Sequence, residues 1–454
     1  MFASHIYKNS GLASDPNFNN VSLLLHGDGT SGAQNNTFLD SSTNNFTITR
    51  NGTPTQGSFS PFSLSGEYSI ATNGGSGYFN GTTDFLTIPD SEQFNLAANN
   101  FTIECWVYFN SSVNQYYFGQ IQAVAANRSF SHAVIGGKYY FEVRSGTTAY
   151  AIQSVNNITL NEWTHIAAVR NGDTITLYRN GTSIGSVSVT GVTVNNSSLL
   201  VGVGGAGSYN TEPLNGYISN ARLVNGTAIY TENFIPPTSP LTAVANTSLL
   251  CNFTNAGIFD NAAKNNLITV GNSRISTIQK KFGTGSMLFN GSTDYCRTIA
   301  PAGTHQFGTG NFTIECWAYC TNLAGGTTNA MEIIDFRSST INEARPTLAI
   351  LNSQFLYFSN GSNRIVSSTI SANTWYHVAV VRSSGSTKLY VNGTNVGVTY
   401  ADTTNYLDSN PTIANWFPNP VYGFAGYIDD IRITKGIARY TANFTPPTQA
   451  FPNL

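Results

Sequence analysis

The chain has 454 residues, of which 41% are hydrophobic and 10% are charged, and its net charge at pH 7 is −2. Ordinary globular domains carry about 25% charged residues, so this surface must consist mainly of uncharged polar side chains. A near-neutral chain does not attract nucleic acid, and no apolar run approaches the roughly 20 residues of a membrane span. We therefore expect neither nucleic-acid binding nor membrane insertion.

The first element is a leader, residues 1–20, in which the hydrophobic residues have no regular spacing. It lacks the apolar core of a signal peptide, which predicts assembly in the cytoplasm. Apolar side chains on an unstructured arm cost ordering entropy, which contact with a partner would offset. We expect this arm to dock onto another protein or another copy of the chain through Phe2, Ile6, Tyr7, Leu12 and Phe18.

Residues 101–107 show the clearest strand pattern, because apolar residues alternate with Thr102, Glu104 and Trp106. One face of this strand is predicted to enter a core, and the other is a mixed polar and aromatic face. We expect Glu104 to be an exposed member of that second face. Trp106 would either pack within the protein, the more common role of a strand tryptophan, or stack on a sugar.

Residues 174–187 read as a β-hairpin, with two alternating strands joined by Asn180-Gly181. Asn-Gly supplies the two positive φ angles of a type I′ turn, whose twist suits the flanking strands. The same hairpin recurs at 388–397, and helical periodicity is hard to find over any long window. An all-β chain with turn signals at short intervals predicts β-sandwiches.

The chain is a tandem duplication. The string NFTIECW at 100–106 returns unchanged at 311–317, and other motifs keep the same order at a displacement of 210–212 residues. These pairs are 79–84 and 289–294, 163–170 and 375–382, 216–218 and 426–428, and 230–238 and 440–448. A period this long is a whole domain, since solenoid units have roughly 20–50 residues.

The duplication and the prolines set the predicted boundaries. We place the arm at 1–20, the first sandwich at 21–240, and the second sandwich with a proline-rich tail at 241–454. The prolines at 236–240 predict a stiff, extended exit from the first domain, and those at 446–452 repeat it at the end. A short, proline-rich linker favours a defined orientation between the two domains.

Five cysteines are too few and odd in number for a disulfide scaffold. Cys105 and Cys316 occupy equivalent strand positions and are predicted to be small buried residues. Cys296, Cys316 and Cys320 are close enough in sequence that a bridge in the second half stays open.

The ordered motifs resemble a laminin G-like domain of the concanavalin A-like lectin/glucanase superfamily in each half. FNGTTDF, NNFTIECWVYF, NEWTHIAAVR and GYISNARLV carry the resemblance in the first half, and FNGSTDY, GNFTIECWAYC, NTWYHVAVVR and GYIDDIRIT carry it in the second. It implies two consecutive concanavalin A-like jelly-roll β-sandwiches. The opening string at 22–29 and the closing Phe-x-Pro-Pro-Thr strings are similar to those of predicted virion proteins of marine tailed phages.

The superfamily includes glycoside hydrolases, and retaining hydrolysis needs two carboxyl groups about 5–5.5 Å apart. Members that resemble laminarinases carry them in a Glu-x-Asp-x-x-Glu pattern, which is absent from this sequence. His165 and His377 lie in matching Trp-x-His strings, and the resemblance implies that both are core strand residues. We predict that the protein is not an enzyme and has no catalytic residues.

Calcium is the one cofactor that the resemblance suggests, because members of this superfamily often hold a structural Ca²⁺ through oxygen ligands. Asp429 and Asp430 match a family position, where the first half has Ser219 and Asn220 instead. The full set of candidate ligands is Asp28, Asp40, Asp260, Asp429 and Asp430. The alternative is that these aspartates cap turns.

For carbohydrate binding, the loops in which the halves differ matter more than the shared strands. The second half has the string WFPNPVY at 416–422, and a proline-stiffened loop would hold exposed aromatic rings ready to stack on a sugar. We expect Trp416 and Tyr422 to stack and Asn415 and Asn419 to donate or accept hydrogen bonds.

Together these features predict a non-enzymatic virion surface protein of a phage, serving as a capsid decoration, head fibre or tail appendage. Its lectin-like domains would adhere to host-surface glycans or build the particle, with other virion proteins or further copies as partners. It would lie on the virion surface, assembled in the host cytoplasm and extracellular after lysis. The alternatives are a free-standing carbohydrate-binding lectin and a glycoside hydrolase.

Overall fold

A computed structural model describes residues 14–62, 67–209, 211–324, 329–417 and 419–453. The described part is almost entirely strand and loop, as predicted. Its helices are single turns, namely η1 (Phe18–Asn20), α1 (Ile70–Asn73), η2 (Glu92–Phe94) and η3 (Ala125–Asn127). Within these ranges no helix is long and apolar enough to cross a membrane.

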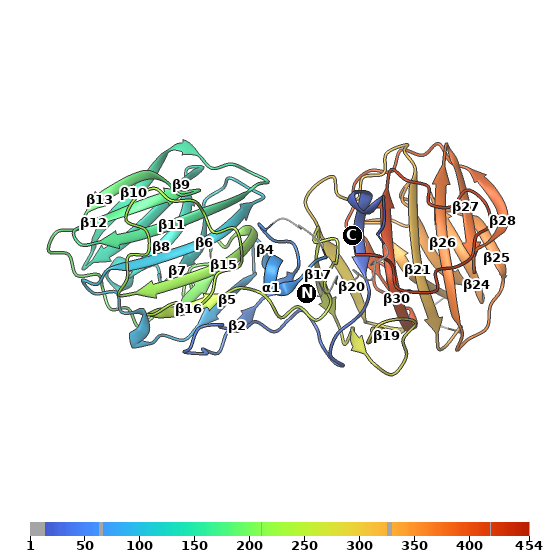
Figure 1. The fold of residues 1–454 in the computed structure, drawn as a ribbon, viewed down its shortest axis with the longest axis horizontal. Coiled ribbons are helices and arrows are strands. Elements are labelled where there is room, and N and C mark those ends of the chain that lie inside the picture. Colours follow the sequence, from blue (N-terminus) through green and yellow to red (C-terminus); the bar gives the residue numbers. More distant parts are fainter. Residues whose placement is uncertain (1–13, 63–66, 210, 325–328, 418, 454) are drawn as a thin grey trace, which may run out of the picture.

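Two β-sandwiches lie side by side (Figure 1). The front sheet of the first consists of β3 (Thr55–Gly57), β4 (Ser76–Asn80), β6 (Phe101–Phe109), β11 (Trp163–Asn171), β12 (Thr174–Arg179), β13 (Thr182–Ser188), β15 (Asn215–Asn225) and β16 (Thr247–Cys251). Its back sheet consists of β2 (Thr49–Asn51), β5 (Phe85–Ile88), β7 (Gln115–Gly119), β8 (Phe130–Ile135), β9 (Lys138–Ser145), β10 (Thr148–Asn157) and β14 (Val201–Val203). The strand orders are β13-β12-β11-β6-β15-β4-β3, with β16 on β15, and β10-β9-β8-β7-β14-β5-β2.

The second sandwich repeats this topology. Its front sheet consists of β1 (Val21–Leu25), β18 (Arg274–Ser276), β19 (Ser286–Asn290), β21 (Phe312–Cys320), β26 (Trp375–Ser383), β27 (Ser386–Val391), β28 (Thr394–Ala401) and β30 (Ala425–Lys435). Its back sheet consists of β17 (Asn266–Val270), β20 (Tyr295–Ile299), β22 (Ala330–Asp335), β23 (Thr347–Leu351), β24 (Gln354–Ser359), β25 (Ser362–Thr369) and β29 (Thr412–Ile413). The orders are β28-β27-β26-β21-β30-β19-β18, with β1 on β30, and β25-β24-β23-β22-β29-β20-β17.

The first described strand, β1, belongs to the front sheet of the second sandwich. Strand β1 pairs antiparallel with β30 of the second sandwich, so the blue start of the chain lies beside red β30 in Figure 1. Strand β16, which follows the predicted boundary at 240, pairs instead with β15 of the first sandwich. The boundaries drawn at 21–240 and 241–454 therefore do not coincide with the sandwiches, because these two equivalent strands are exchanged across them.

The sandwiches also share a sheet and a hydrophobic contact. A pair between Gly57 of β3 and Asn266 of β17 joins the first front sheet to the second back sheet. Next to it, Ile299 of the second sandwich lies in one cluster with Tyr108 and Tyr217 of the first. The two domains are thus in direct contact as well as joined by the linker.

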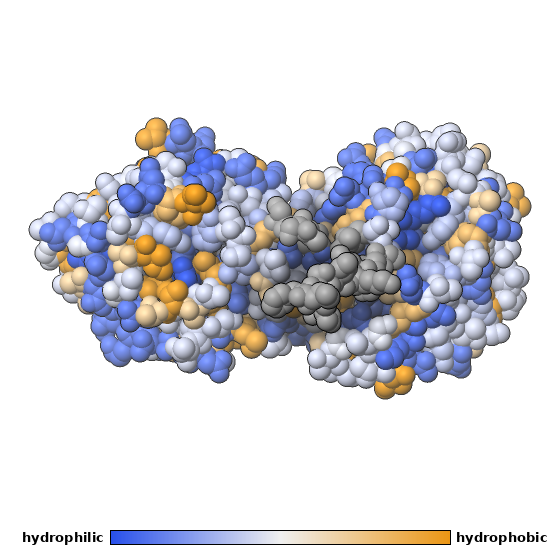
Figure 2. All heavy atoms as spheres, viewed as in Figure 1, coloured by the Kyte–Doolittle hydropathy of each residue, from blue (hydrophilic) through white to orange (hydrophobic). Residues whose placement is uncertain are grey.

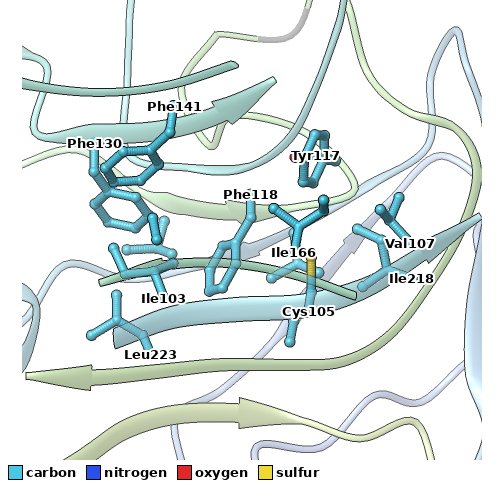
Figure 3. Packing of buried hydrophobic residues seen from close by; sticks show 14 of the residues in the cluster. Ile103, Cys105, Val107, Tyr117, Phe118, Phe130, Phe141, Ile166, Ile218 and Leu223 are labelled. Atoms are coloured by element: carbon cyan, nitrogen blue, oxygen red, sulfur yellow. The ribbon is translucent and has the colours of Figure 1, made fainter. Parts of the chain in front are cut away.

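Each sandwich has its own core between its two sheets. In the first, the inward residues of β6 meet Phe118 and Phe141 of the back sheet (Figure 3). Phe101 and the matching Phe312 are both fully buried, as the repeat predicts. All five cysteines are buried and unpaired, which confirms the prediction for Cys105 and Cys316 and leaves no bridge in the second half.

The predicted hairpin is present. Strands β12 and β13 are joined by Asn180 and Gly181, whose φ angles are 46° and 74°. The glycine is needed for a second reason, because a Cβ at Gly181 would collide with the carbonyl oxygen of Phe234. The turn therefore holds the hairpin against the segment that follows β15.

Candidate functional site

A buried polar network lies on the front sheet of the first sandwich, on the side away from the core. The carboxylate of Glu104 accepts hydrogen bonds from Arg222 Nε at 2.9 Å, from Tyr230 OH at 2.9 Å and from His165 Nε2 at 3.1 Å. Glu104 and His165 have no exposed surface, and Arg222 is 4% exposed. The expectation that Glu104 is an exposed polar residue was wrong. His165 is a buried strand residue, but it lies on the face away from the core rather than in the core itself.

The second sandwich has the same network. Glu315 accepts from Arg432 Nε at 3.0 Å, from Tyr440 OH at 2.9 Å and from His377 Nε2 at 3.2 Å. Asp15 adds a second carboxylate, 3.2 Å from Arg432 Nη1. The repeat is a sequence signal for this constellation, because Glu, His, Arg and Tyr all recur in the second half at a displacement of 210–212 residues.

These carboxylates are held in their charged form by their partners. Burial by itself raises the pKa of Glu315, but the charge of Arg432 and the hydrogen bond from His377 outweigh it and lower that pKa to about 2. The pKa of Glu104 is lowered in the same way, against burial, by His165 and Arg222. A carboxylate that is saturated with donors and closed to water cannot transfer a proton to a substrate.

The network instead fastens the closing segment of each sandwich. The ring of Tyr230 stacks on Phe234 at 3.6 Å with an interplanar angle of 6°, and Tyr440 stacks on Phe444 at 3.6 Å and 7°. Each tyrosine also donates to the buried glutamate. The network is therefore a structural clamp on the Tyr-x-x-x-Phe-x-Pro-Pro string.

The loop predicted to present aromatic rings is largely turned inward. Trp416 is only 7% exposed and lies 5.8 Å from the half-buried Tyr422. Asn415 is fully buried and holds the loop, donating to the Ser292 carbonyl and accepting from the Trp416 and Tyr422 amides. Asn419 alone of the four is exposed. The expectation of an exposed Trp416 was wrong, because Arg337 and Tyr422 pack against the ring.

A second charged cluster packs beneath that tryptophan. The guanidinium of Arg337 lies 4.8 Å from the Trp416 ring centre and pairs with Glu332 and Asp335, at 2.7 Å and 2.5 Å. Burial, followed by the charge of Asp335, raises the pKa of Glu332 to about 8. Arg337 is 3% exposed, so this cluster is also part of the packed interior.

Two of the aspartates suggested for calcium cap backbone amides. Asp40 accepts from the amides of Ser42, Phe46 and Leu250, and Asp260 accepts from those of Leu24, Ala262, Lys264 and Asn265. In each sandwich the aspartate thus anchors the exchanged strand, β16 or β1. The oxygens point at N–H donors, which is the alternative role that the sequence left open.

The other three aspartates are also used within the protein. Asp28 accepts from Thr284, Asp430 lies 2.5 Å from His26 Nδ1, and Asp429 accepts from the amides of Lys281 and Phe282. Burial and the nearby Asp430 raise the pKa of Asp429 to about 7. No group of three or more His, Cys, Asp or Glu side chains that could hold a metal is found among the described residues. The residues present do not fit a shared calcium site.

An open groove of about 500 Å³ lies beside the first network, over Trp106. Trp106 is half-buried, and Phe62 meets its ring edge to face at 6.0 Å. The other lining residues are Pro61, Thr72, Ile235, Pro236, Pro237, Thr238 and Ser239. We name this hollow the Trp106 groove. It combines an indole face with prolines, hydroxyl groups and Ile235, which is 86% exposed.

The matching position in the second sandwich is closed. Trp317 is 5% exposed, with Phe282 at 5.8 Å from its ring and Lys281 Nζ at 3.8 Å above it. Asp429 holds this cover in place through the two amides described above. The first half has Pro61 before Phe62 where the second has Lys281 before Phe282, so only the first tryptophan stays open.

The predicted docking arm is described only in its last part. Phe18 packs against Val21, Leu24 and Phe451 of the same chain, and Asp15 pairs with Arg432 and Arg439. Phe2, Ile6, Tyr7 and Leu12 lie outside the described residues.

Solved structures offer three comparisons. The chain is similar to domains LG4-5 of the mouse laminin α1 chain, at 12% identity and a TM-score of 0.29, over 86% of this chain and 99% of that one. It is similar to domain 4 of AbnA, an extracellular arabinanase of Geobacillus stearothermophilus solved with arabinotriose, at 19% identity and a TM-score of 0.31, over 39% and 87%. It is also similar to the binding domain of botulinum neurotoxin DC in complex with SialylT, at 9% identity and a TM-score of 0.31, over 93% of this chain and 96% of that one.

A family model matches both halves of the chain. No curated protein matches the chain. The Laminin_G_3 model, described as concanavalin A-like lectin/glucanases superfamily, matches residues 80–229 and 290–438, which together exceed half of the chain. Each match begins at the end of β4 or β19 and ends just before Tyr230 or Tyr440, the tyrosines of the two clamps. The chain therefore belongs to the laminin G-like family of the concanavalin A-like lectin/glucanase superfamily, with one such domain in each half.

Proposed function

We propose that this chain is a non-enzymatic surface protein of a tailed-phage virion, a capsid decoration, head fibre or tail appendage, whose first sandwich holds a glycan in the Trp106 groove. Its partners are other virion proteins, further copies of itself and host-surface glycans. The virion part rests on the opening and closing strings of the sequence. Portal, capsid or tail genes beside this one would support it, and a genome without them would contradict it.

The observation that carries the glycan part is the contrast between Trp106 and Trp317. An indole face stacks on the apolar face of a sugar ring, and hydroxyl groups at its rim bond the sugar hydroxyls. Thr72, Thr238 and Ser239 lie at that rim in the first sandwich. In the second, Lys281 occupies the space over the indole. The buried, saturated carboxylates of both clamps support a binding role rather than a hydrolytic one.

The test is a glycan array with the full chain, followed by calorimetric titration of the best ligand. Trp106→Ala is expected to weaken binding roughly 30-fold, the effect of truncating a central aromatic contact. Pro61→Lys, which introduces the cover found in the second sandwich, should weaken it without removing a core side chain. Trp317→Ala is the matched control and should leave the affinity unchanged.

Three outcomes would contradict the proposal. If the array gives no ligand, the chain is not a lectin; if Trp106→Ala binds normally while remaining folded by circular dichroism, the groove is not the site. Release of reducing sugar from a polysaccharide by the purified protein would instead favour a glycoside hydrolase.

A further inference from the structure

A second pocket, of about 370 Å³, opens at the end of the first sandwich between its two sheets. Its polar lining consists of Ser154 and Asn156 of β10, Arg179 of β12, and Thr182 and Ser183 of β13. The pairing of β10 with β9 shifts register between Gln153 and Asn157, so the backbone bulges away where the pocket opens. We name this hollow the Arg179 pocket.

Arg179 is the chemically distinctive group of this pocket. Its guanidinium lies 5.5 Å from the ring centre of Tyr139, and its Nη2 donates to Thr159 Oγ1 at 2.6 Å. Its Nε is buried and has no hydrogen-bond partner among the described residues. The Arg179 side chain is 28% exposed, so a ligand in the pocket would meet the open part of its guanidinium rather than the enclosed Nε. A guanidinium that lines a cavity favours an anionic ligand, because its charge and its remaining N–H donors suit a carboxylate.

The carboxylate that Arg179 already has is a weak competitor. Glu162 Oε1 lies 3.4 Å from Arg179 Nη2, and the two side chains are 50% and 28% exposed. An ion pair with this much exposure contributes little to stability, so a ligand carboxylate would displace Glu162 at small cost. Arginine also presents a planar fork that matches two carboxylate oxygens.

The second sandwich has different side chains at the matching position. Tyr139 and Phe355 are equivalent, since the amide of each donates to a serine hydroxyl, Ser154 or Ser367. In the second sandwich Phe355 is met by the ring of Tyr376 at 5.6 Å, and Val391 stands where the first has Arg179. Thr164 stands at the position of that tyrosine in the first sandwich, where the guanidinium of Arg179 instead lies against the Tyr139 ring.

The Arg179 pocket is joined to the Trp106 groove by the closing segment. Ser183 in the pocket donates its amide to Asn233 Oδ1 at 3.0 Å, and Ile235 and Pro236, just after Asn233, line the groove. Ile235, at the groove end of this segment, is 86% exposed. One extended ligand crossing this segment would meet both hollows.

We propose that the Arg179 pocket holds the carboxylate of an acidic sugar unit whose neighbouring units reach toward the Trp106 groove. The saccharide part of this inference rests on the proposed function, whereas the carboxylate part rests on Arg179 alone. The first sandwich is then the ligand-binding half of the molecule and is selective for acidic glycans, because the second has Val391 at the position of Arg179.

The experiment is calorimetric titration of the full chain with trigalacturonic acid, with its methyl ester and with acetate. The methyl ester keeps the sugar and removes the charge, and acetate keeps the charge and removes the sugar. We expect the acid to bind roughly 10- to 100-fold more tightly than the ester, the range for a charge-assisted hydrogen bond. Arg179→Val should abolish this preference, and Arg179→Lys should retain part of it.

Two further variants keep the test independent of folding defects. Glu162→Gln removes the competing carboxylate and should strengthen binding of the acid but not of the ester. Arg364→Val removes an arginine from the second sandwich and controls for the change in net charge; it should leave both affinities unchanged.

The outcomes separate this inference from the proposed function. Equal affinity for acid and ester, or an unchanged preference in a folded Arg179→Val, would overturn the pocket while leaving a Trp106-dependent lectin. Binding of acetate at Arg179, seen by its loss in Arg179→Val, without any binding of trigalacturonic acid or its ester would overturn the saccharide part, whereas the glycan array decides the proposed function separately. Absence of binding by all three probes would overturn the inference outright.

Discussion

At the scale of single residues, the decisive groups are buried charges whose partners come from distant parts of the chain. Glu315 meets Arg432 and Tyr440 more than a hundred positions along the chain, and no local pattern places them together. The same holds for Glu104. A strand glutamate on the face away from the core is exposed by default, and only the closing segment, folded back over it, excludes water here.

The clamp predicts a pH dependence for the second sandwich. Because the folded-state pKa of Glu315 is lowered from 4.5 to about 2, its contribution to stability is complete above pH 4.5 and is lost as the pH falls toward 2. Glu315→Gln removes the buried negative charge that pairs with Arg432. It should lower the free energy of unfolding at pH 7 by about 3 kcal/mol.

Thermal unfolding followed by circular dichroism between pH 2 and 7 checks this, with the exposed Glu92→Gln as control. The variant should lose less stability on acidification than the parent does. A parent and a Glu315→Gln variant with the same pH profile would show that the glutamate is not the titrating clamp.

At the scale of elements, the exchange of β1 and β16 defines how each sandwich is completed. Strand β16 follows the closing segment of the first sandwich directly and pairs with β15. The second closing segment is followed by no such strand among the described residues, and β1 from the other end of the chain takes the equivalent place on β30. The N-terminal strand therefore fastens the last domain.

Removing β1 should affect only the second sandwich. A chain that starts at His26 loses the buried Leu23 and Leu25, each worth about 2–5 kcal/mol in a packed core, and leaves an edge of β30 unpaired. Hydrogen exchange measured by mass spectrometry should rise in β30 and β21 and stay unchanged in β15 and β6. Equal protection in both sandwiches would mean that β1 is dispensable.

At the scale of the whole molecule, two domains with one fold have different surfaces. Hydrophilic residues dominate the face drawn in Figure 2, and hydrophobic residues gather there in small groups. The Trp106 groove and the Arg179 pocket lie on the first sandwich, whereas the second has Lys281 over its tryptophan and Val391 at the position of Arg179. The two copies thus share a framework and differ in the side chains at these two places.

The arm belongs to this scale, because we expect it to attach the molecule to a particle. A chain that starts at Val21 keeps β1, so both sandwiches should remain folded, although the second loses the buried ion pairs of Asp15 and becomes less stable. Incorporation into particles, measured by blotting purified virions, should fail. Normal incorporation of this shortened chain would place attachment on a sandwich face instead.

The sequence alone determined the features whose causes are local or repeated. Alternating strands, Asn-Gly turns and a displacement of 210–212 residues predicted the duplication, the all-β class and the buried Phe101 and Phe312. These follow from backbone preferences and side-chain periodicity, which act over a few residues.

Tertiary structure decided the rest. Trp416 has a loop-like sequence environment but is buried by Arg337, and Trp106 has the same local sequence as Trp317 but remains open. Asp40 and Asp260, expected as metal ligands, instead accept hydrogen bonds from backbone amides of β16 and β1, which come from distant parts of the chain. Burial, strand exchange and open grooves depend on which distant segments cover a residue, and that is set by packing of the whole chain.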